Sequence, residues 1–279
     1  MTKTFYSNRY VIFLGALLAG AVITMFGSTA WTLLMSINMV FTPNWPWGVP
    51  AMGLVLWLLW QYLDGKGWPS STSEKRQWLL RGNAVSTIEW KWAVFAGVAS
   101  VIALSGMWIV FRTLVWMAPN NLPDWSGMPI YVSIPIIIMA SMVAPVTEEA
   151  GFRGYFQVPL EKYFGPMAAI IITSVVFALV HLTHGFFLPK LIVYFLFGIV
   201  AAISAYLTNS ILPGMLVHMF ADLTFFILVW PTDKTRVLYG DGGGDVWFWI
   251  HVVQMCVFAA LAIWGYLRLS RLKGTTPPN

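Results

Sequence analysis

The sequence predicts an all-α protein, a polytopic membrane helical bundle of about eight transmembrane helices. Of its 279 residues, 58% are hydrophobic and only 10% are charged, and the mean hydropathy is +0.73. A soluble globular domain carries about 25% charged residues, so this chain lacks more than half of the charge that a water-exposed surface needs. The apolar residues also form long runs, comparable to the ~20 residues that cross a bilayer. We therefore expect a single integral membrane domain over residues 1–279.

Eight apolar runs follow one another along the chain. The first, residues 11–41, is longer than one span requires, and the second, residues 48–63, is shorter, so their boundary is poorly defined. The first run stays apolar beyond Ala30, where a signal peptide would end, so we expect an uncleaved span. The largest polar connection, residues 64–91, is expected to be a solvated cytoplasmic loop. The other six runs are residues 92–117, 130–147, 166–182, 190–207, 211–229 and 247–267.

The composition excludes several classes of protein. Disordered and coiled-coil chains need abundant charge, and secreted disulfide-rich domains need many cysteines, whereas this chain has only Cys256. The formal net charge is +5, but the basic residues form no stripe with interleaved aromatic residues, so we expect no nucleic-acid partner. The expected partner is the lipid bilayer, and the sequence does not specify an oligomeric state.

The positive charges predict how the chain is oriented in the membrane. With eight spans and a cytoplasmic N-terminus, twelve of the 16 Lys and Arg residues fall on the cytoplasmic side. This asymmetry supports both termini in the cytoplasm. We expect the membrane to be the plasma membrane of a prokaryote. Of the other four, Arg112 and Lys190 lie near span ends, where we expect their side chains to snorkel to the interface. The twelve are Lys3, Arg9, Lys66, Lys75, Arg76, Arg81, Lys91, Arg153, Lys162, Arg268, Arg271 and Lys273.

A few ionisable residues fall at membrane depth. A charged side chain at the centre of a span costs roughly 2.5 to 3.5 kcal/mol on insertion scales, so such residues need partners or a function. A single intramembrane histidine is more often a hydrogen-bonded packing residue than a ligand. Here, however, acids and histidines come from three successive segments, which favours a functional site. They are Glu148, Glu149, Arg153, His181, His184, His218 and Asp222.

The hairpin around Gly165 predicts that two of these residues meet. Glu149 lies 16 residues before Gly165 and His181 lies 16 residues after it. If both arms are helical, each residue is about 24 Å from the turn, at one level. The stretch 150–163 would then continue the fourth span toward the cytoplasm. His218 and Asp222 are four residues apart, so they share one face of the seventh span.

The two neighbouring glutamates are expected to have different roles. Glu149 and Arg153 are four residues apart, a spacing that favours an ion pair on one helical face. Glu148 points about 100° away and lacks that cation. A carboxylate of this kind in a low-dielectric site suits a general base that acts on water. We therefore assign Glu149 and Arg153 to structure and Glu148 to chemistry.

Three short motifs resemble those of a known family, the type II CAAX prenyl endopeptidase and bacteriocin-processing group of intramembrane proteases. Glu-Glu-x-x-x-Arg matches residues 148–153, Phe-x-x-x-His matches residues 177–181, and His-x-x-x-Asn/Asp matches residues 218–222. Each motif is weak alone, but three in order on successive apolar segments make a specific signal. The resemblance covers about residues 135–230, which we expect to form the catalytic core.

The resemblance implies an intramembrane endopeptidase that hydrolyses a peptide bond of a membrane-anchored or lipidated protein or peptide. Carried over, Glu148 activates a water molecule, His181 holds that water, and His218 with Asp222 binds the substrate carbonyl or a metal. Phe177, Glu149 and Arg153 would support the site. The same four catalytic residues, Glu148, His181, His218 and Asp222, offer nitrogen and oxygen ligands for zinc, and the sequence leaves open whether the cofactor is Zn²⁺ or none.

Asp222 departs from the better-known members, which have Asn at this position. Asn can donate a hydrogen bond to an oxyanion, whereas an ionised Asp cannot. Asp222 is therefore protonated, or orients His218, or is itself a ligand. Two other functions compete with catalysis: a non-catalytic immunity or scaffold protein of the same family, and a proton-coupled transporter. The sequence shows no internal repeat of the kind that many transporters carry.

Overall fold

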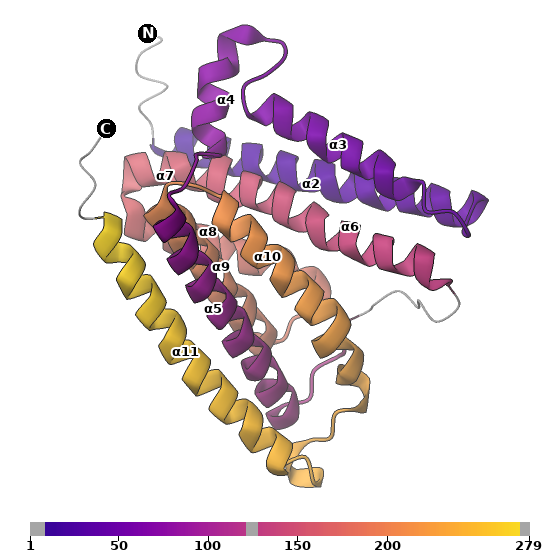
Figure 1. Ribbon diagram of the computed structural model, residues 1–279. Coiled ribbons are helices and arrows are strands. Elements are labelled where there is room, and N and C mark those ends of the chain that lie inside the picture. The colour runs from indigo at the N-terminus through magenta and orange to yellow at the C-terminus, as the bar shows by residue number, and fades with distance from the viewer. Residues whose placement is uncertain (1–8, 121–127, 274–279) are drawn as a thin grey trace. The chain divides into compact units, whose positions relative to one another are not determined.

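The structure of the protein, a computed structural model, describes residues 9–120 and 128–273 and is helical with no strand in those residues (Figure 1). The predicted all-α class is confirmed. Lys3 and the two chain ends, which enter the orientation prediction, lie outside the described residues. The chain divides into two compact units, one of residues 1–83 and 124–170 and the other of residues 84–123 and 171–279. The expectation of one domain stays a prediction.

Each of the eight predicted apolar runs is a helix. Among the described residues, seven helical segments are long and apolar enough to cross a membrane. The eighth helix, α3 (Gly48–Leu63), has 16 residues and is about 24 Å long, shorter than the ~30 Å hydrocarbon core. The seven are Arg9–Phe41, Thr87–Leu114, Ile130–Phe164, Pro166–His184, Leu188–Thr208, Leu212–Thr235 and Val246–Lys273. The protein is therefore an integral membrane protein.

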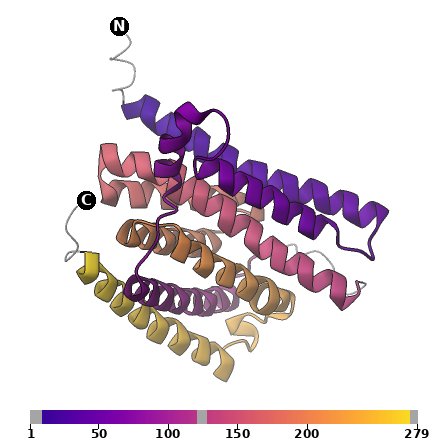
Figure 2. The same cartoon turned by 45° about the horizontal axis from the view of Figure 1, so that its top comes forward.

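The first unit is built on close packing of α2 (Arg9–Phe41) against the long helix that follows residue 130. Figure 2 shows α2 and α3 running alongside α6 (Ile130–Glu148). The buried side of α2 carries Ala16, Gly20 and Gly27. A Cβ atom added to Gly20 would lie 2.7 Å from the carbonyl oxygen of Gly151. Small residues let helix backbones approach in this way, which is the common mode of helix packing in membranes.

Part of the polar connection, residues 64–91, is helical and not a loop as predicted, although most of its residues stay exposed or half-buried. It contains α4 (Ser73–Leu80), and Arg81 ends this helix in the left-handed conformation with φ 55°. The buried Arg81 guanidinium makes an ion pair with Glu161, which also accepts a 2.8 Å hydrogen bond from Gln157 Nε2. The buried Arg76 donates to the backbone carbonyl oxygens of Tyr62, Lys66, Gly67 and Pro69. These bonds compensate for removing two cations from water.

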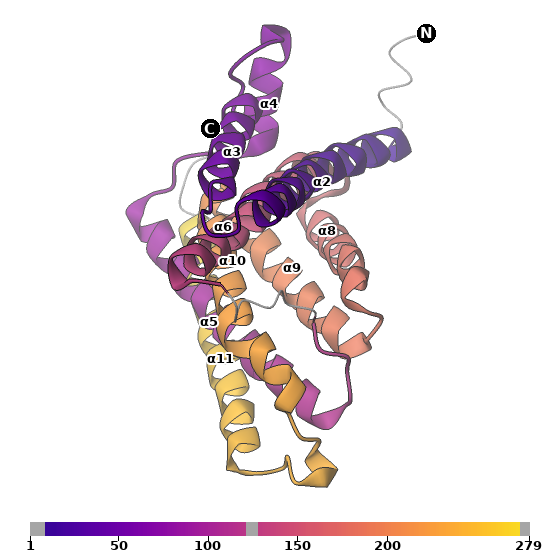
Figure 3. The same ribbon diagram turned by 90° about the vertical axis from the view of Figure 1, so that its right-hand side faces the viewer.

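The second unit packs around α5 (Thr87–Leu114), which begins with a capping box between Ser86 and Glu89. Figure 3 shows α5 and α11 (Val246–Lys273) running together, and a Cβ on Gly265 of α11 would lie 2.8 Å from the Cβ of Ala96. The unit also contains the part of α8 (Pro166–Val180) that begins at residue 171, and six further helical segments before α11. They are η3 (His181–His184), α9 (Leu188–Thr208), α10 (Leu212–Thr224), η4 (Phe225–Val229), η5 (Trp230–Thr235) and η6 (Tyr239–Asp241).

Candidate active site

The first motif lies where the long helix of the first unit changes its winding. After α6, residues Glu149–Phe156 form a π-helix, η2, and α7 (Gln157–Phe164) returns to α-helical winding. The amide of Gln157 donates to the carbonyl oxygen of Phe152, five residues back. The prediction that residues 150–163 continue the fourth span is confirmed. Short π-helical stretches often occur at functional sites.

Glu149 and Arg153 form the predicted ion pair inside this π-helix. Arg153 Nε lies 3.6 Å from Glu149 Oε2, and both side chains are 0% exposed. Glu148 is half-buried. Arg153 also interacts electrostatically with Glu148, so the expectation that Glu148 lacks this cation was wrong. The two carboxylates differ in burial, and their separate structural and chemical roles stay a prediction.

The second motif places His181 at the start of η3, directly after α8. Its Nδ1 lies 2.7 Å from the backbone carbonyl oxygen of Phe177. A carbonyl oxygen can only accept, so Nδ1 must carry the proton and donate. In the neutral ring, Nε2 then holds the lone pair. His181 is thus set up to accept a hydrogen bond, or to bind a metal, through Nε2.

The third motif lies on α10, where His218 and Asp222 share one face as predicted. His218 Nε2 lies 3.8 Å from Asp222 Oδ1. The His218 ring packs on Phe197, with centroids 4.7 Å apart, and on Phe177, with centroids 6.1 Å apart. Phe177 is 1% exposed. The carboxylate and the two aromatic rings together restrict the orientation of the His218 imidazole.

Phe177 joins the second and third motifs in the second unit. Its ring centroid is 4.6 Å from that of His181 and 6.1 Å from that of His218. The structure therefore brings both candidate histidines to one buried phenylalanine. Glu148 belongs to the first unit, whereas both histidines belong to the second. A contact between Glu148 and the histidines therefore stays a prediction.

The zinc site also stays a prediction. Within the part of the chain that the structure describes, no group of three or more His, Cys, Asp or Glu side chains is gathered as a metal site. The second unit alone offers His181, His218 and Asp222, and the last of these faces the Nε2 atom of His218. That arrangement fits a carboxylate that orients an imidazole better than it fits a complete ligand set.

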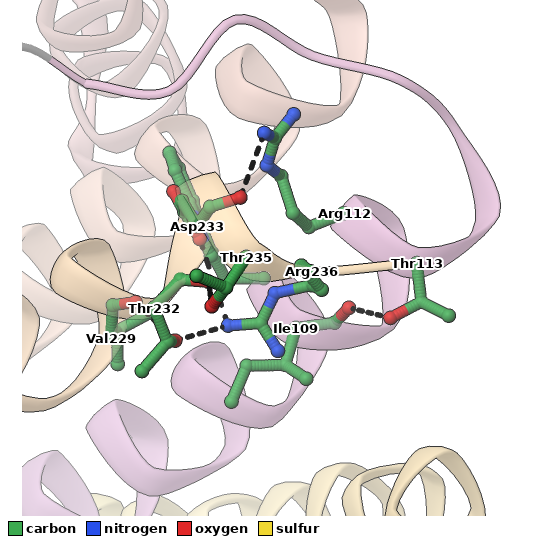
Figure 4. A network of polar contacts seen from close by, with 9 residues as sticks. Ile109, Arg112, Thr113, Val229, Thr232, Asp233, Thr235 and Arg236 are labelled. Carbon is green, nitrogen blue, oxygen red and sulfur yellow. Dashed lines mark hydrogen bonds and ion pairs between the residues drawn. The ribbon is translucent and has the colours of Figure 1, made fainter. Parts of the chain in front are cut away.

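The expectation that Arg112 and Lys190 snorkel was wrong. They are 7% and 1% exposed, because each finds a buried partner in the second unit. Arg112 Nη2 donates to the backbone oxygen of Asp233 at 3.0 Å, and Asp233 also pairs with Arg236 at 3.6 Å (Figure 4). Asp233 accepts from Trp108 Nε1 as well, at 3.1 Å and 3.2 Å. Trp108 and Arg112 lie 125 and 121 residues from Asp233, so no local pattern in the sequence indicates these contacts.

Comparison with known proteins agrees with the motifs. Residues 130–224 match the family model described as "Type II CAAX prenyl endopeptidase Rce1-like". Neither the curated proteins nor the solved structures give a match to the chain. The matched stretch contains Glu148 at the end of α6, the π-helix that begins at Glu149, and the histidines of η3 and α10. The predicted resemblance to this family is therefore confirmed for residues 130–224.

Proposed function

We propose that the protein is an intramembrane endopeptidase that hydrolyses a peptide bond of a membrane-anchored or lipidated protein or peptide. The observation that carries this proposal is the pairing of His181 and His218 around Phe177, with the His181 tautomer set by its bond to the Phe177 carbonyl oxygen. The family match over residues 130–224 supports a peptidase reaction. The buried charges suit a site that excludes bulk water.

In the proposed reaction, Glu148 removes a proton from a water molecule whose position is held by His181 Nε2. The water oxygen attacks the peptide carbonyl, and a C–O bond forms as the carbonyl π electrons move to oxygen. His218, protonated on both ring nitrogens with Nε2 facing Asp222, donates a hydrogen bond from Nδ1 to this oxyanion. When the C–N bond breaks, Glu148 returns the proton to the departing amine, so one water molecule is consumed and an acid and an amine are released.

Asp222 is proposed to orient His218. Of the three roles left open by the sequence, this one is favoured by the 3.8 Å separation between its Oδ1 and His218 Nε2. A carboxylate next to an imidazole fixes the orientation of the ring. In this role Asp222 does not touch the substrate, so Asn, which keeps the shape and a carbonyl oxygen, should replace it with limited loss.

The test is cleavage of a membrane-anchored peptide reporter by the purified protein in liposomes. Glu148→Gln keeps the size of the side chain but cannot accept the proton, and we expect at least a 10²-fold loss of cleavage rate, since general-base catalysis contributes roughly 10²- to 10⁴-fold. Glu74→Gln, an exposed residue of α4 in the same unit, is the matched control and should behave as the wild type.

Two results would contradict the proposal. Equal cleavage by Glu148→Gln and the wild type would remove Glu148 from the mechanism. A Glu148→Gln variant that keeps the cellular phenotype would instead support a non-catalytic member of the family. In the same assay, Asp222→Asn should keep most of the activity, and Asp222→Leu should lose about 10- to 100-fold, the usual cost of removing a group that orients a functional histidine.

A further inference from the structure

A chain of buried and half-buried hydrogen bonds runs from Lys190 to His184 through Tyr194, whose ring stacks on His181. We infer that Tyr194 is a positioning residue for His181, and that Lys190 sets the direction of the hydrogen bonds that hold Tyr194 in place. The inference rests on the proposed function, because it gives Tyr194 a task in that site. All residues involved belong to the second unit.

The stacking of Tyr194 on His181 is close. The two ring centroids are 4.3 Å apart and the ring planes make an angle of 24°. The Phe177 ring contacts His181 as well, and its carbonyl oxygen accepts from Nδ1. The stacked Tyr194 ring thus keeps the imidazole from rotating about its hydrogen bond to the Phe177 carbonyl oxygen. Tilting that plane would move Nε2 away from the water that it is proposed to hold.

The Lys190 ammonium sets the direction of the first two hydrogen bonds, because it can only donate. Lys190 Nζ lies 2.6 Å from Asn120 Oδ1, and an ammonium group can only donate, so this oxygen accepts. The amide nitrogen of Asn120 then donates to Tyr194 Oη at 3.4 Å. On the proposed direction, the Tyr194 hydroxyl donates its own proton to His184 Nδ1, which is 2.7 Å away. Every bond in this chain therefore points from Lys190 toward His184.

This direction sets the tautomer of His184, and the bond to the Phe177 carbonyl oxygen sets that of His181. His184 accepts at Nδ1, so its proton is on Nε2, whereas His181 donates at Nδ1 and has its lone pair on Nε2. The two rings lie 5.5 Å apart, yet they are predicted to be opposite tautomers. A network that served packing alone would not require this opposition.

Burial makes the chain rigid. Lys190 is 1% exposed and Asn120 is 6% exposed. Lys190 also donates to the backbone oxygen of His184 at 2.9 Å and lies 5.8 Å from the centroid of Trp108. Buried polar networks that are satisfied in this way specify a single arrangement of their members.

The experiment combines histidine NMR with kinetics on the full-length protein. The chain has four histidines, so ¹⁵N-histidine spectra can be assigned with single His→Gln variants. In the wild type, we expect the Nδ1–H tautomer for His181 and the Nε2–H tautomer for His184. Lys190→Met removes the donor that orients Asn120, so His184 should lose its single tautomer while His181 keeps its own. If the two histidines share one tautomer in the wild type, the inference is overturned, whether or not the protein cleaves the reporter.

The kinetic arm separates stacking from hydrogen bonding. Tyr194→Leu should lower kcat by about 10-fold or more, within the ~10²-fold that a 1 Å misplacement can cost, and leave KM unchanged. Tyr194→Phe keeps the ring and should recover most of that loss, although the His184 spectrum changes. Tyr131→Leu, an exposed tyrosine of α6, is the matched control. Wild-type kcat in a folded Tyr194→Leu variant would overturn the inference and leave the proposed function standing. If that variant does not fold, the spectra of Tyr194→Phe and Lys190→Met decide.

Discussion

Single substitutions of buried charged residues should change the free energy of unfolding strongly, because these side chains are removed from water. Glu149 and Arg153 are both fully buried and lie 3.6 Å apart. A buried pair gains little net stability, since the loss of hydration offsets the attraction. Removing one partner, by contrast, leaves the other charge buried without it.

We therefore expect Arg153→Met and Glu149→Leu each to lower the free energy of unfolding by about 3 to 5 kcal/mol. The double variant should lose clearly less than the sum, because neither charge is then left behind. Denaturant titration in detergent measures all three, with Lys75→Met, an exposed cation of α4, as the control. Losses that simply add would show that the two side chains do not interact.

Some contacts of the ionisable residues could be predicted from the sequence and others could not. The i,i+4 spacing predicted the pairs Glu149–Arg153 and His218–Asp222, since helical geometry alone places such residues on one face. Lys190 was misjudged because its partner, Asn120, is 70 residues away in the sequence. A Lys or Arg near the end of a span can either snorkel to the interface or be buried, and the sequence pattern is the same in both cases. Only tertiary contacts distinguish the two.

At the scale of elements, α2 holds the π-helix by direct contact between backbones. A Cβ atom on Gly20 would lie 2.7 Å from the Gly151 oxygen, and one on Gly151 would lie 2.6 Å from Thr24 Oγ1. Backbone atoms cannot move aside as a flexible side chain can. The stretch that carries the first motif is thus supported from α2.

We expect Gly20→Ala to destabilise the protein by about 1 to 3 kcal/mol, the usual cost of overpacking. Gly15→Ala is the control, since it lies on the same helix and its Cβ would meet nothing within 4 Å. Alanine also favours a helix by up to about 1 kcal/mol, so the control should be neutral or stabilising. Thermal unfolding in detergent compares the two, and equal midpoints would contradict the packing argument.

The apolar runs predicted every long helix, because hydropathy alone decides which segments leave water. The sequence did not predict η2, since a π-helix has the composition of an α-helix. It did not predict the fold of residues 64–91 either. That segment is polar, but Arg76 and Arg81 are satisfied by backbone oxygens and by Glu161, which local polarity does not reveal.

For the whole molecule, the orientation in the membrane follows from the count of spans. If α3 crosses the bilayer, Asn44 and Ser71 lie on opposite sides, and Asp241 shares the side of Asn44. Introduced into a Cys256→Ser background, Asn44→Cys and Asp241→Cys should react with a membrane-impermeant maleimide on intact cells, and Ser71→Cys only after lysis. Labelling of Ser71→Cys on intact cells would contradict eight spans with a cytoplasmic N-terminus.

The π-helix has a consequence for the register of the segment 130–164. An α-helix turns by about 100° per residue, and a turn closed five residues back holds about one residue more than an α-turn. The side chains of α7 are therefore out of phase with those of α6, as though one residue had been inserted between them. If the whole segment is treated as one α-helix of 3.6 residues per turn, the residues after Phe156 are assigned to the wrong helix faces. Deleting one residue there would rotate Glu161 by about a quarter turn and carry it away from Arg81.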